Sequence, residues 1–299
     1  MNKFKQIQEF LSTEAGKKTN TKRLAKKFNI SFEEAAKARA IITRKSKVKE
    51  VTVDFKEVVA YSKKPSIQEV VSYEPYIGGD PNNVLVISDA HLPFEHPDAL
   101  RFCREIQEKY NCGTVVNIGD IIDNYAISRY DKDPSSMAIS AEYEEVLRKL
   151  KAWYKTFPEV KVCIGNHEAR LFKKVALAGL PISWLKDLKS ILEAPSEWTF
   201  EFSYDINGVL YTHGTNYSGD MAALNIARDN RQSTVIGHIH TAAGVRYLSN
   251  RNNTIFGMSV GCLVDDKSYA FAYGKENARK SILSCGVVLN GKTAIVETL

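Results

Sequence analysis

The segment Val84-Leu85-Val86-Ile87-Ser88-Asp89-Ala90-His91 joins a continuous apolar run directly to polar side chains. Four apolar residues in a row, 84–87, predict a strand that is buried on both faces, as in parallel sheets. The pattern after it alternates between helix and strand, over 98–110, 114–118, 140–154 and 160–164. This strand-helix-strand-helix-strand order predicts a layered α/β domain.

The second half of the chain is richer in strands. Seven more are predicted, at 198–202, 209–212, 234–236, 244–248, 254–258, 282–289 and 293–296. Only one clear helix, at 219–229, interrupts them. The C-terminal half is therefore expected to be mostly β-structure.

The six histidines all lie after residue 90, and five of them directly follow predicted strands. A further strand end, Gly119-Asp120-Ile121-Ile122-Asp123, supplies carboxylates instead. In α/β sheets the carboxyl ends of the strands form the ligand crevice. We therefore expect five loops to bring one set of side chains together: Asp89, His91, Asp120, Asn166, His167, His213, His238 and His240.

The chemistry of this set points to metal ions. Imidazole, carboxylate and amide oxygen together suit first-row divalent ions. Asp89-x-His91 and His238-x-His240 each place two side chains on one face of an extended segment, where they can hold one ion or two adjacent ions. A lone histidine in a loop is more often a hydrogen-bonded structural residue, but five beside Asp, Gly and Asn are poorly explained that way. The number of ligands exceeds the need of one tetrahedral ion and favours two ions that share a carboxylate.

The chain resembles the calcineurin-like metallophosphoesterases in five motifs that occur in the family's order. They are Asp89-x-His91, Gly119-Asp120-x-x-Asp123, Gly165-Asn166-His167-Glu168, His213-Gly214 and Gly237-His238-x-His240. The resemblance covers about residues 84–299. It implies an α/β fold of the four-layer α/β/β/α type with a dinuclear centre at one edge. The cofactors it implies are two divalent transition-metal ions, with manganese favoured and iron, nickel, cobalt or zinc as alternatives.

The resemblance also implies a role for each matched side chain. One ion would be held by Asp89, His91, Asp120 and His240. The other would be held by Asp120, Asn166, His213 and His238, so that Asp120 bridges the two. His167 would stabilise charge on the phosphoryl group and protonate the leaving oxygen, and Asp123 would orient its ring. We interpret Glu168 as a residue that fixes the loop, and Arg170 as structural or solvated.

Two features separate the chain from the Ser/Thr protein phosphatases of that family. Those phosphatases carry an arginine directly after the residue that matches Asp123, whereas this chain has Asn124. They also lack the Gly-His-x-His motif that is present here at 237–240. Dephosphorylation of proteins is therefore disfavoured.

The N-terminal region differs from the rest in charge and pattern. Residues 1–66 hold 17 Lys and Arg against 7 Asp and Glu, whereas the whole chain has a net charge of +6. Helical spacing of apolar residues and the capping box Ser31-Phe32-Glu33-Glu34 predict short helices that resemble a helix-turn-helix. We therefore expect a small basic helical domain at 1–50, a connector at 51–83 and the phosphoesterase domain at 84–299.

The basic helices have two readings. A surface that binds nucleic acid would use Lys22, Arg23, Lys26, Lys27, Lys37, Arg44 and Lys45. Alternatively, the helices form an accessory domain for homo-oligomerisation, because Glu33 and Glu34 would repel phosphate at the start of a recognition helix.

Composition excludes several classes of protein. A content of 44% hydrophobic and 25% charged residues is that of a globular chain. Five cysteines without a Cys-x-x-Cys pair indicate reduced thiols. No signal-peptide pattern and no apolar run of membrane-spanning length are present. The expectation is a cytoplasmic protein without membrane association.

Three functions remain open. The favoured one is a nuclease or other phosphodiesterase that acts on DNA or RNA, which accounts for the basic helices and the Gly-His-x-His motif. The second is a phosphodiesterase or phosphatase for cyclic nucleotides or nucleotides, with N-terminal helices that serve oligomerisation. The third is a DNA-binding regulator with a silent phosphoesterase scaffold, and the complete ligand set argues against it.

Overall fold

A computed structural model describes residues 3–13, 18–31, 33–36, 70–129, 132–133, 136–265, 268 and 280–299. The chain divides into two compact units, Met1–Gln68 and Glu69–Leu299. The predicted helix beyond residue 36, with Lys37, Arg44 and Lys45, lies outside the described residues, as do residues 51–69 of the predicted connector.

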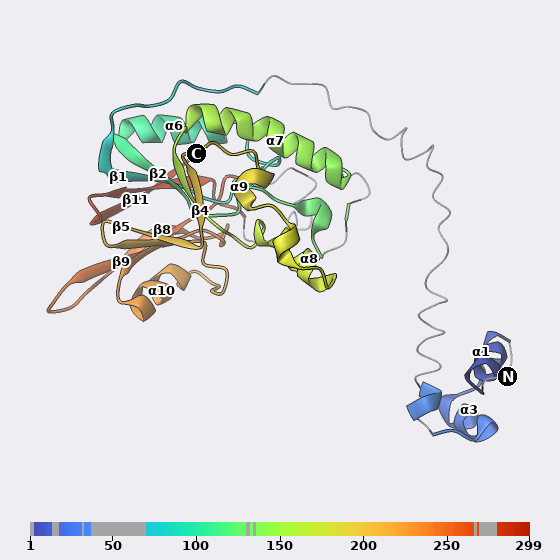
Figure 1. Ribbon diagram of the computed structural model, residues 1–299. Helices are drawn as coiled ribbons and strands as arrows, with labels where there is room; N and C mark the ends of the chain where they lie inside the picture. Colours follow the sequence, from blue (N-terminus) through green and yellow to red (C-terminus); the bar gives the residue numbers. More distant parts are fainter. Residues whose placement is uncertain are drawn as a thin grey trace. The chain divides into compact units, whose positions relative to one another are not determined.

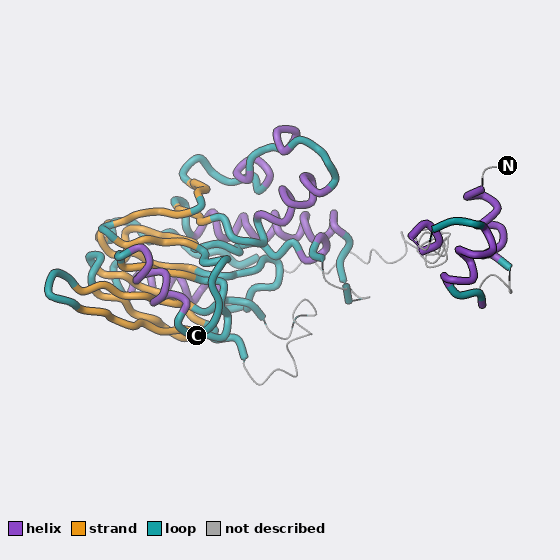
Figure 2. The backbone as a smooth tube through the Cα atoms, turned by 90° about the horizontal axis from the view of Figure 1, so that it is seen from below, coloured by secondary structure: helices purple, strands orange, loops and turns teal. Residues whose placement is uncertain are grey.

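The larger unit is built on two sheets (Figures 1 and 2). The first has the strand order β11-β10-β1-β2-β3-β4, with bounds Thr293–Thr298, Ser284–Leu289, Asp80–Ile87, Cys112–Asn117, Val160–Cys163 and Trp198–Glu201. The second has the order β5-β6-β7-β9-β8, with bounds Ser203–Ile206, Val209–Thr212, Ser233–Ile236, Thr254–Val260 and Ala243–Ser249. Strands β1 to β4 are parallel to one another, and β6 is parallel to β7.

Helices cover the outer faces of both sheets. Helices α6 (Ala99–Lys109) and α7 (Ile139–Thr156) pack on the first sheet, and α10 (Ala222–Asn230) packs on the second (Figure 1). The layers therefore run helix, sheet, sheet, helix, which confirms the expected α/β/β/α sandwich. Shorter elements join the strands: η1 (Tyr125–Ile127), α8 (Ala169–Leu177), η2 (Ile182–Trp184) and α9 (Leu188–Ile191).

Strand β1 shows why the apolar run decides this fold. Its residues point alternately to the two faces of the sheet, as in any strand. Leu85 and Ile87 belong to the core beneath α6 and α7, whereas Val84 and Val86 belong to the core between the two sheets. All four side chains are almost fully buried, and each such burial contributes about 1.5–3 kcal/mol.

Residues 70–79, which precede β1, pack on the helical face of the larger unit to which they belong. The backbone N–H of Tyr73 donates to Thr156 Oγ1 over 3.0 Å, and Arg104 Nε donates to the carbonyl of Glu74 over 2.9 Å. Val70 and Tyr73 also pack on the core beneath α6 and α7. This stretch therefore follows the helical face before it enters the sheet.

Several elements differ from the sequence prediction, β5 and α8 among them. The strand expected at 198–202 is β4, and the chain passes after Phe202 into β5, which pairs with β6 in the second sheet. Helix α8 is absent from the prediction. Its N-cap residue, Glu168, makes no side-chain cap hydrogen bond, so the sequence signal for the start of the helix is missing.

The smaller unit contains helices α1 (Lys3–Ser12) and α3 (Thr21–Phe28) and a helical turn at 33–36. Its small core consists of Ile7, Leu11, Leu24 and Ala35. The predicted capping box is confirmed: Ser31 N–H donates to Glu34 Oε2 over 2.8 Å, and Glu34 N–H donates to Ser31 Oγ over 3.1 Å. The basic side chains of α3 are exposed, at Lys22, Arg23, Lys26 and Lys27.

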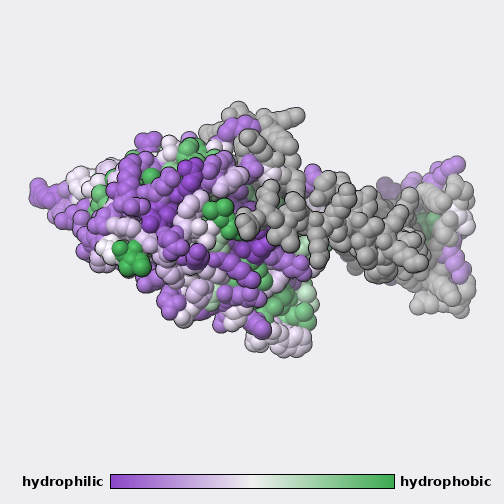
Figure 3. All heavy atoms as spheres, turned by 90° about the horizontal axis from the view of Figure 1, so that it is seen from above, coloured by the Kyte–Doolittle hydropathy of each residue, from purple (hydrophilic) through white to green (hydrophobic). Residues whose placement is uncertain are grey.

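The face of the larger unit in Figure 3 is mostly hydrophilic, with separate hydrophobic patches. All five cysteines are buried and free of disulfides. Among the residues that the structure describes, no helix has both the length and the apolar character that a membrane crossing requires.

Candidate metal centre

The predicted side chains all stand just beyond the carboxyl ends of strands. In the first sheet, β1 leads to Asp89 and His91, β2 to Asp120 and Asp123, and β3 to Asn166 and His167. In the second sheet, β6 leads to His213, and β7 leads to His238 and His240. The structure brings these residues together, because Asp120 of the first sheet lies 3.0 Å from His213 of the second.

One cluster of acceptor atoms forms around His240. Its Nε2 lies 3.2 Å from Asp89 Oδ1 and 3.2 Å from His91 Nε2. Asp89, His91 and His240 together offer three potential metal-ligating atoms within 4.8 Å of one another. Asp120 Oδ2 adds a carboxylate oxygen at 4.0 Å from His91 Nε2.

A second cluster forms around His213. Its Nε2 lies 3.0 Å from Asp120 Oδ2 and 3.1 Å from the amide oxygen of Asn166. His238 completes this group, with its ligand atom within 4.8 Å of those of Asp120 and His213. Asp120 therefore borders both clusters, as a bridging carboxylate must.

The hydrogen bond at Nδ1 of His213 shows that its other nitrogen, Nε2, is the one available to a metal ion. His213 Nδ1 lies 3.0 Å from the carbonyl of Ile118, so this nitrogen carries the hydrogen and donates it. The Nε2 lone pair then faces the oxygens of Asp120 and Asn166, which are also acceptors. Three such atoms at about hydrogen-bond distance need a positive centre among them, which a metal ion supplies when it is bound and a proton on Nε2 supplies when it is not.

Electrostatics lead to the same conclusion. Burial by itself would lower the pKa of His91, but hydrogen bonds with Asp123 and Asp89 outweigh it and raise the pKa to about 10. The same two effects act on His213: burial by itself would lower its pKa, but the neighbouring Asp120 carboxylate raises it to about 9. The buried carboxylates thus strongly stabilise positive charge at the site, and two bound divalent cations would supply that charge.

The ligands are held by backbone conformations that side chains rarely adopt. Asp89, His91, Asp120 and His238 have φ angles of 47°, 52°, 51° and 66°. Such left-handed residues cost about 1–3 kcal/mol each and cluster at functional sites. Gly119, with φ of 100°, has no such cost, and a Cβ there would lie 2.8 Å from His213 Nδ1.

Glu168 fixes the loops from within. Its buried carboxylate accepts the backbone N–H groups of Asp120, Gly165 and Ile122, over 2.9, 2.8 and 3.2 Å. Burial, together with the neighbouring charge of Asp120, raises the pKa of Glu168 to about 7. This arrangement agrees with the loop-fixing role inferred from the sequence, because one side chain ties the β2 loop to the β3 loop.

Replacement of Glu168 by Ala should therefore destabilise the protein. Three buried N–H groups lose their acceptor, so we expect the free energy of unfolding to fall by about 3–5 kcal/mol. Urea unfolding followed by circular dichroism measures it. The exposed Glu159→Ala serves as control and should change stability by less than about 0.5 kcal/mol. A loss below about 1 kcal/mol for Glu168→Ala would show that water replaces the carboxylate.

His167 lies at the rim of the centre, with 13% of its side chain exposed. Its Nδ1 is 2.7 Å from the backbone carbonyl of Asp123, to which it donates. The Asp123 carboxylate, in contrast, lies closest to His91, with Oδ2 at 2.9 Å from Nδ1. Asp123 thus contacts both rings: its carboxylate hydrogen-bonds to His91, while its backbone carbonyl accepts from His167 and its Oδ1 lies 3.7 Å from His167 Nδ1. The sequence predicted only the contact with His167.

Arg170 is the site residue whose importance the sequence did not indicate. Its Nη2 lies 2.8 Å from His167 Nε2, and its Nη1 donates to the carbonyl of Asp123 over 2.8 Å. Its position at the first turn of α8, three residues after His167, is the signal that suggests this contact, because residues at i and i+3 are neighbours on a helix. A cation therefore lies beside the rim histidine.

Comparison with solved structures finds several similar chains, each covering about three quarters of this one. Vacuolar Protein Sorting 29 from Cryptosporidium parvum is 15% identical, with 74% of this chain and 98% of that chain covered and a TM-score of 0.35. The nuclease MPE from Pseudomonas putida is 12% identical, with coverages of 72% and 87% and a TM-score of 0.36. The phosphoesterase YfcE from E. coli is 11% identical, with coverages of 71% and 98% and a TM-score of 0.33.

The sequence itself gives the decisive comparison. No curated protein sequence matches the chain. A family model described as Calcineurin-like phosphoesterase matches residues 83–250, more than half of the chain and a span that contains every candidate ligand from Asp89 to His240. The chain belongs to the calcineurin-like phosphoesterases.

Proposed function

We propose that this protein is a metal-dependent phosphodiesterase that hydrolyses nucleic acid. Its family uses a dinuclear divalent metal site, and the two acceptor clusters that border Asp120 are the observation that carries the proposal. In this proposal one ion is held by Asp89, His91, Asp120 and His240. The other is held by Asp120, Asn166, His213 and His238, and manganese is the favoured metal.

His167 and Arg170 have separate roles beside the metal centre in this proposal. When bound, two divalent ions polarise a phosphoryl group and lower the pKa of water at the site. His167 donates its Nδ1 hydrogen to the carbonyl of Asp123, and its Nε2 accepts from Arg170 Nη2. To protonate the leaving oxygen, Nε2 must first take up a proton while the guanidinium turns to the phosphoryl group. The Arg170 guanidinium beside Nε2 can bind an oxygen of the phosphoryl group and stabilise its charge.

The choice of nucleic acid as substrate rests on the smaller unit. Lys22, Arg23, Lys26 and Lys27 are exposed along one short helix, α3, and the whole N-terminal region is basic. Such a surface attracts phosphate backbones without regard to sequence.

A substrate panel tests the proposal directly. Metal-stripped protein is reloaded with manganese, iron, nickel, cobalt or zinc and given bis-p-nitrophenyl phosphate, p-nitrophenyl phosphate, plasmid DNA and labelled single strands. We expect hydrolysis of the diester and of DNA or RNA, with the highest rate in manganese. Hydrolysis of the monoester alone, or of cyclic nucleotides without any action on polynucleotides, would replace this proposal by the small-molecule alternative.

The role of α3 has its own prediction. Replacement of Lys22, Arg23, Lys26 and Lys27 by Gln should weaken DNA binding and flatten its salt dependence. If all four contact phosphate, the slope of log K against log salt decreases by about 3.6, from about 0.9 per duplex contact. Fluorescence anisotropy at several salt concentrations measures the slope.

The matched control replaces Lys151 and Lys155, exposed on α7, by Gln. We expect a smaller change in slope per residue than on α3. An unchanged slope in the α3 variant would instead support the accessory or oligomerisation role of the N-terminal helices.

A further inference from the structure

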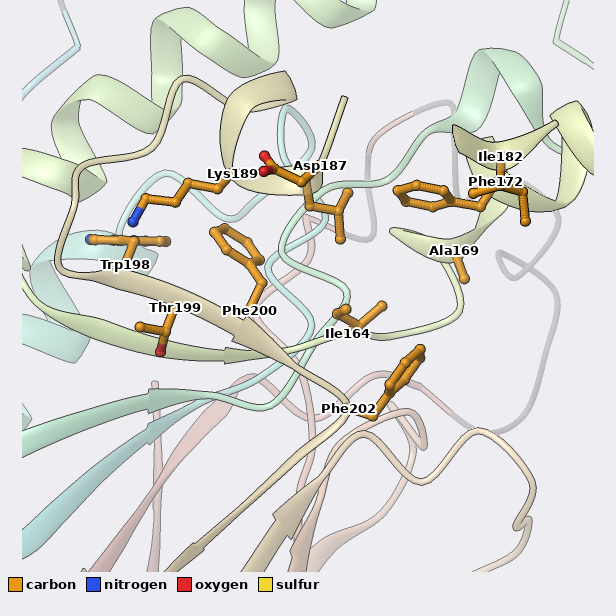
Figure 4. Close-up of a pocket in the computed structure, with 11 residues that line it drawn as sticks. Ile164, Ala169, Phe172, Ile182, Asp187, Lys189, Trp198, Thr199, Phe200 and Phe202 are labelled. Carbon is orange, nitrogen blue, oxygen red and sulfur yellow. The ribbon is translucent and has the colours of Figure 1, made fainter. Parts of the chain in front are cut away.

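A cavity of about 660 Å³ lies between the start of α8, α9 and β4 (Figure 4). Residues of the β3–α8 loop, α8, η2, α9 and β4 line it, and four of its side chains are aromatic: Phe172, Trp198, Phe200 and Phe202. This volume is typical of pockets that take small organic groups. Phe202, at the edge of the cavity, has 74% of its surface exposed.

The cavity adjoins the loop that carries two of the site residues. Ile164 and Ala169 both line it, and they flank the segment that contains Asn166 and His167. Two residues of chain span at most about 7 Å, so the wall of the cavity begins within about 7 Å of the backbone of both site residues. Phe202 directly follows β4, which is parallel to β3, and so stands at the same edge of the sheet.

The polar groups in the wall already have partners within the protein. Asp187 Oδ1 accepts the N–H of Ser190 over 2.7 Å, and Lys189 Nζ donates to the carbonyl of Ser196 over 2.6 Å. Thr199 Oγ1 lies 2.8 Å from the hydroxyl of Tyr204. An occupant is therefore held by ring stacking and apolar contact more than by specific hydrogen bonds.

The other face of α8 is cationic. Arg170 and Lys174, one turn apart, lie on it, while Ala169 and Phe172 line the cavity. At the first turn of α8, an aromatic cavity and the Arg170 guanidinium beside His167 thus lie on the two sides of the same short stretch of chain.

We propose that the cavity binds one unstacked base of a single-stranded nucleic acid while the cations of α8 hold the adjoining phosphates. The proposal rests on the proposed phosphodiesterase function and adds the substrate class to it. A nucleotide unit has the flat apolar ring and the anion that the two faces of α8 require. Stacking on aromatic side chains tolerates every base, whereas a paired duplex base cannot enter the cavity.

Two chromogenic diesters with the same leaving group test the proposal. Thymidine 5′-(p-nitrophenyl phosphate) carries a base, and methyl p-nitrophenyl phosphate does not. We expect wild-type protein to prefer the thymidine ester in kcat/KM by roughly 10- to 100-fold, the worth of one stacked base. Phe202→Ala should remove most of this preference, mainly through KM, and Phe202→Tyr should retain it.

The matched control is Trp184→Ala. Trp184 is 73% exposed but does not line the cavity, so its removal should leave the preference unchanged. A second readout needs no turnover: with EDTA present, an oligothymidylate that contains 2-aminopurine should lose fluorescence on binding to wild-type protein and much less on binding to Phe202→Ala.

The proposal is overturned if wild-type protein shows no preference for the thymidine ester, or if Phe202→Ala leaves the preference intact. It is also overturned if Phe202→Ala lowers kcat/KM equally for both esters, because Phe202 would then only support the loop. A stronger preference for dodecyl p-nitrophenyl phosphate would assign the cavity to lipid chains instead. If wild-type protein hydrolyses none of the diesters, the proposed function fails, and the 2-aminopurine titration still decides whether the cavity binds a base.

Discussion

Asp120→Ala is expected to lower the metal content of the purified protein from about two divalent ions per chain to well below one, and to abolish hydrolysis. The reason is geometric. Asp120 Oδ2 lies 3.0 Å from His213 Nε2 and 4.0 Å from His91 Nε2, so one substitution removes a ligand from both clusters. Inductively coupled plasma mass spectrometry after dialysis against trace metal measures the content.

The matched control is His240→Ala. His240 belongs to only one cluster, with Asp89 and His91, so this variant should lose mainly one ion. The contrast between the two variants separates a bridging role from a general loss of folding. Two retained ions in Asp120→Ala would refute the bridge.

His167→Gln is expected to keep both ions while it slows hydrolysis by roughly 10²–10⁴-fold, the usual range for a lost general acid. His167 is not among the ligands assigned to either ion: it lies at the rim, and its Nε2 is 2.8 Å from Arg170 Nη2 and 3.6 Å from Asp120 Oδ2. The loss should be smaller for p-nitrophenyl esters than for alkyl esters, because p-nitrophenolate leaves without a proton.

A series of diesters with leaving groups of increasing pKa measures this effect in wild type and variant. The difference in rate should grow with the pKa of the leaving group. A constant difference across the series would mean that His167 positions the phosphoryl group without protonating it.

The strand ends were predictable because their signals are local. The apolar run before Asp89 and the short β-prone segment before Asn117 mark buried strands. Because ligands bind at the carboxyl ends of strands in α/β sheets, the residues that follow these strands are predicted to form the site. The capping box of Ser31 and Glu34 is local in the same sense, since donor and acceptor are three residues apart.

Other features of the site depend on contacts that sequence spacing does not reveal. The Asp123 carboxylate contacts His91, 32 residues away, and only the folded loops decide that it does so. Positive φ angles at Asp89 and Asp120 arise because tertiary hydrogen bonds hold the loops there, as Glu168 does for Asp120.

The cavity has the same origin. The sequence predicts Phe202 as the last residue of a strand. In the structure the chain passes from one sheet to the other at this point, and the ring of Phe202 is exposed. Helix α8, which forms another wall, carries few of the local signals that predict a helix.

Anomalous diffraction from crystals grown with manganese tests the central claim most directly. The account predicts two peaks about 3.5–4 Å apart with the Asp120 carboxylate between them. One peak should lie among Asp89, His91 and His240, and the other among Asn166, His213 and His238. A single peak, or two peaks without Asp120 between them, would contradict the dinuclear centre proposed for this chain.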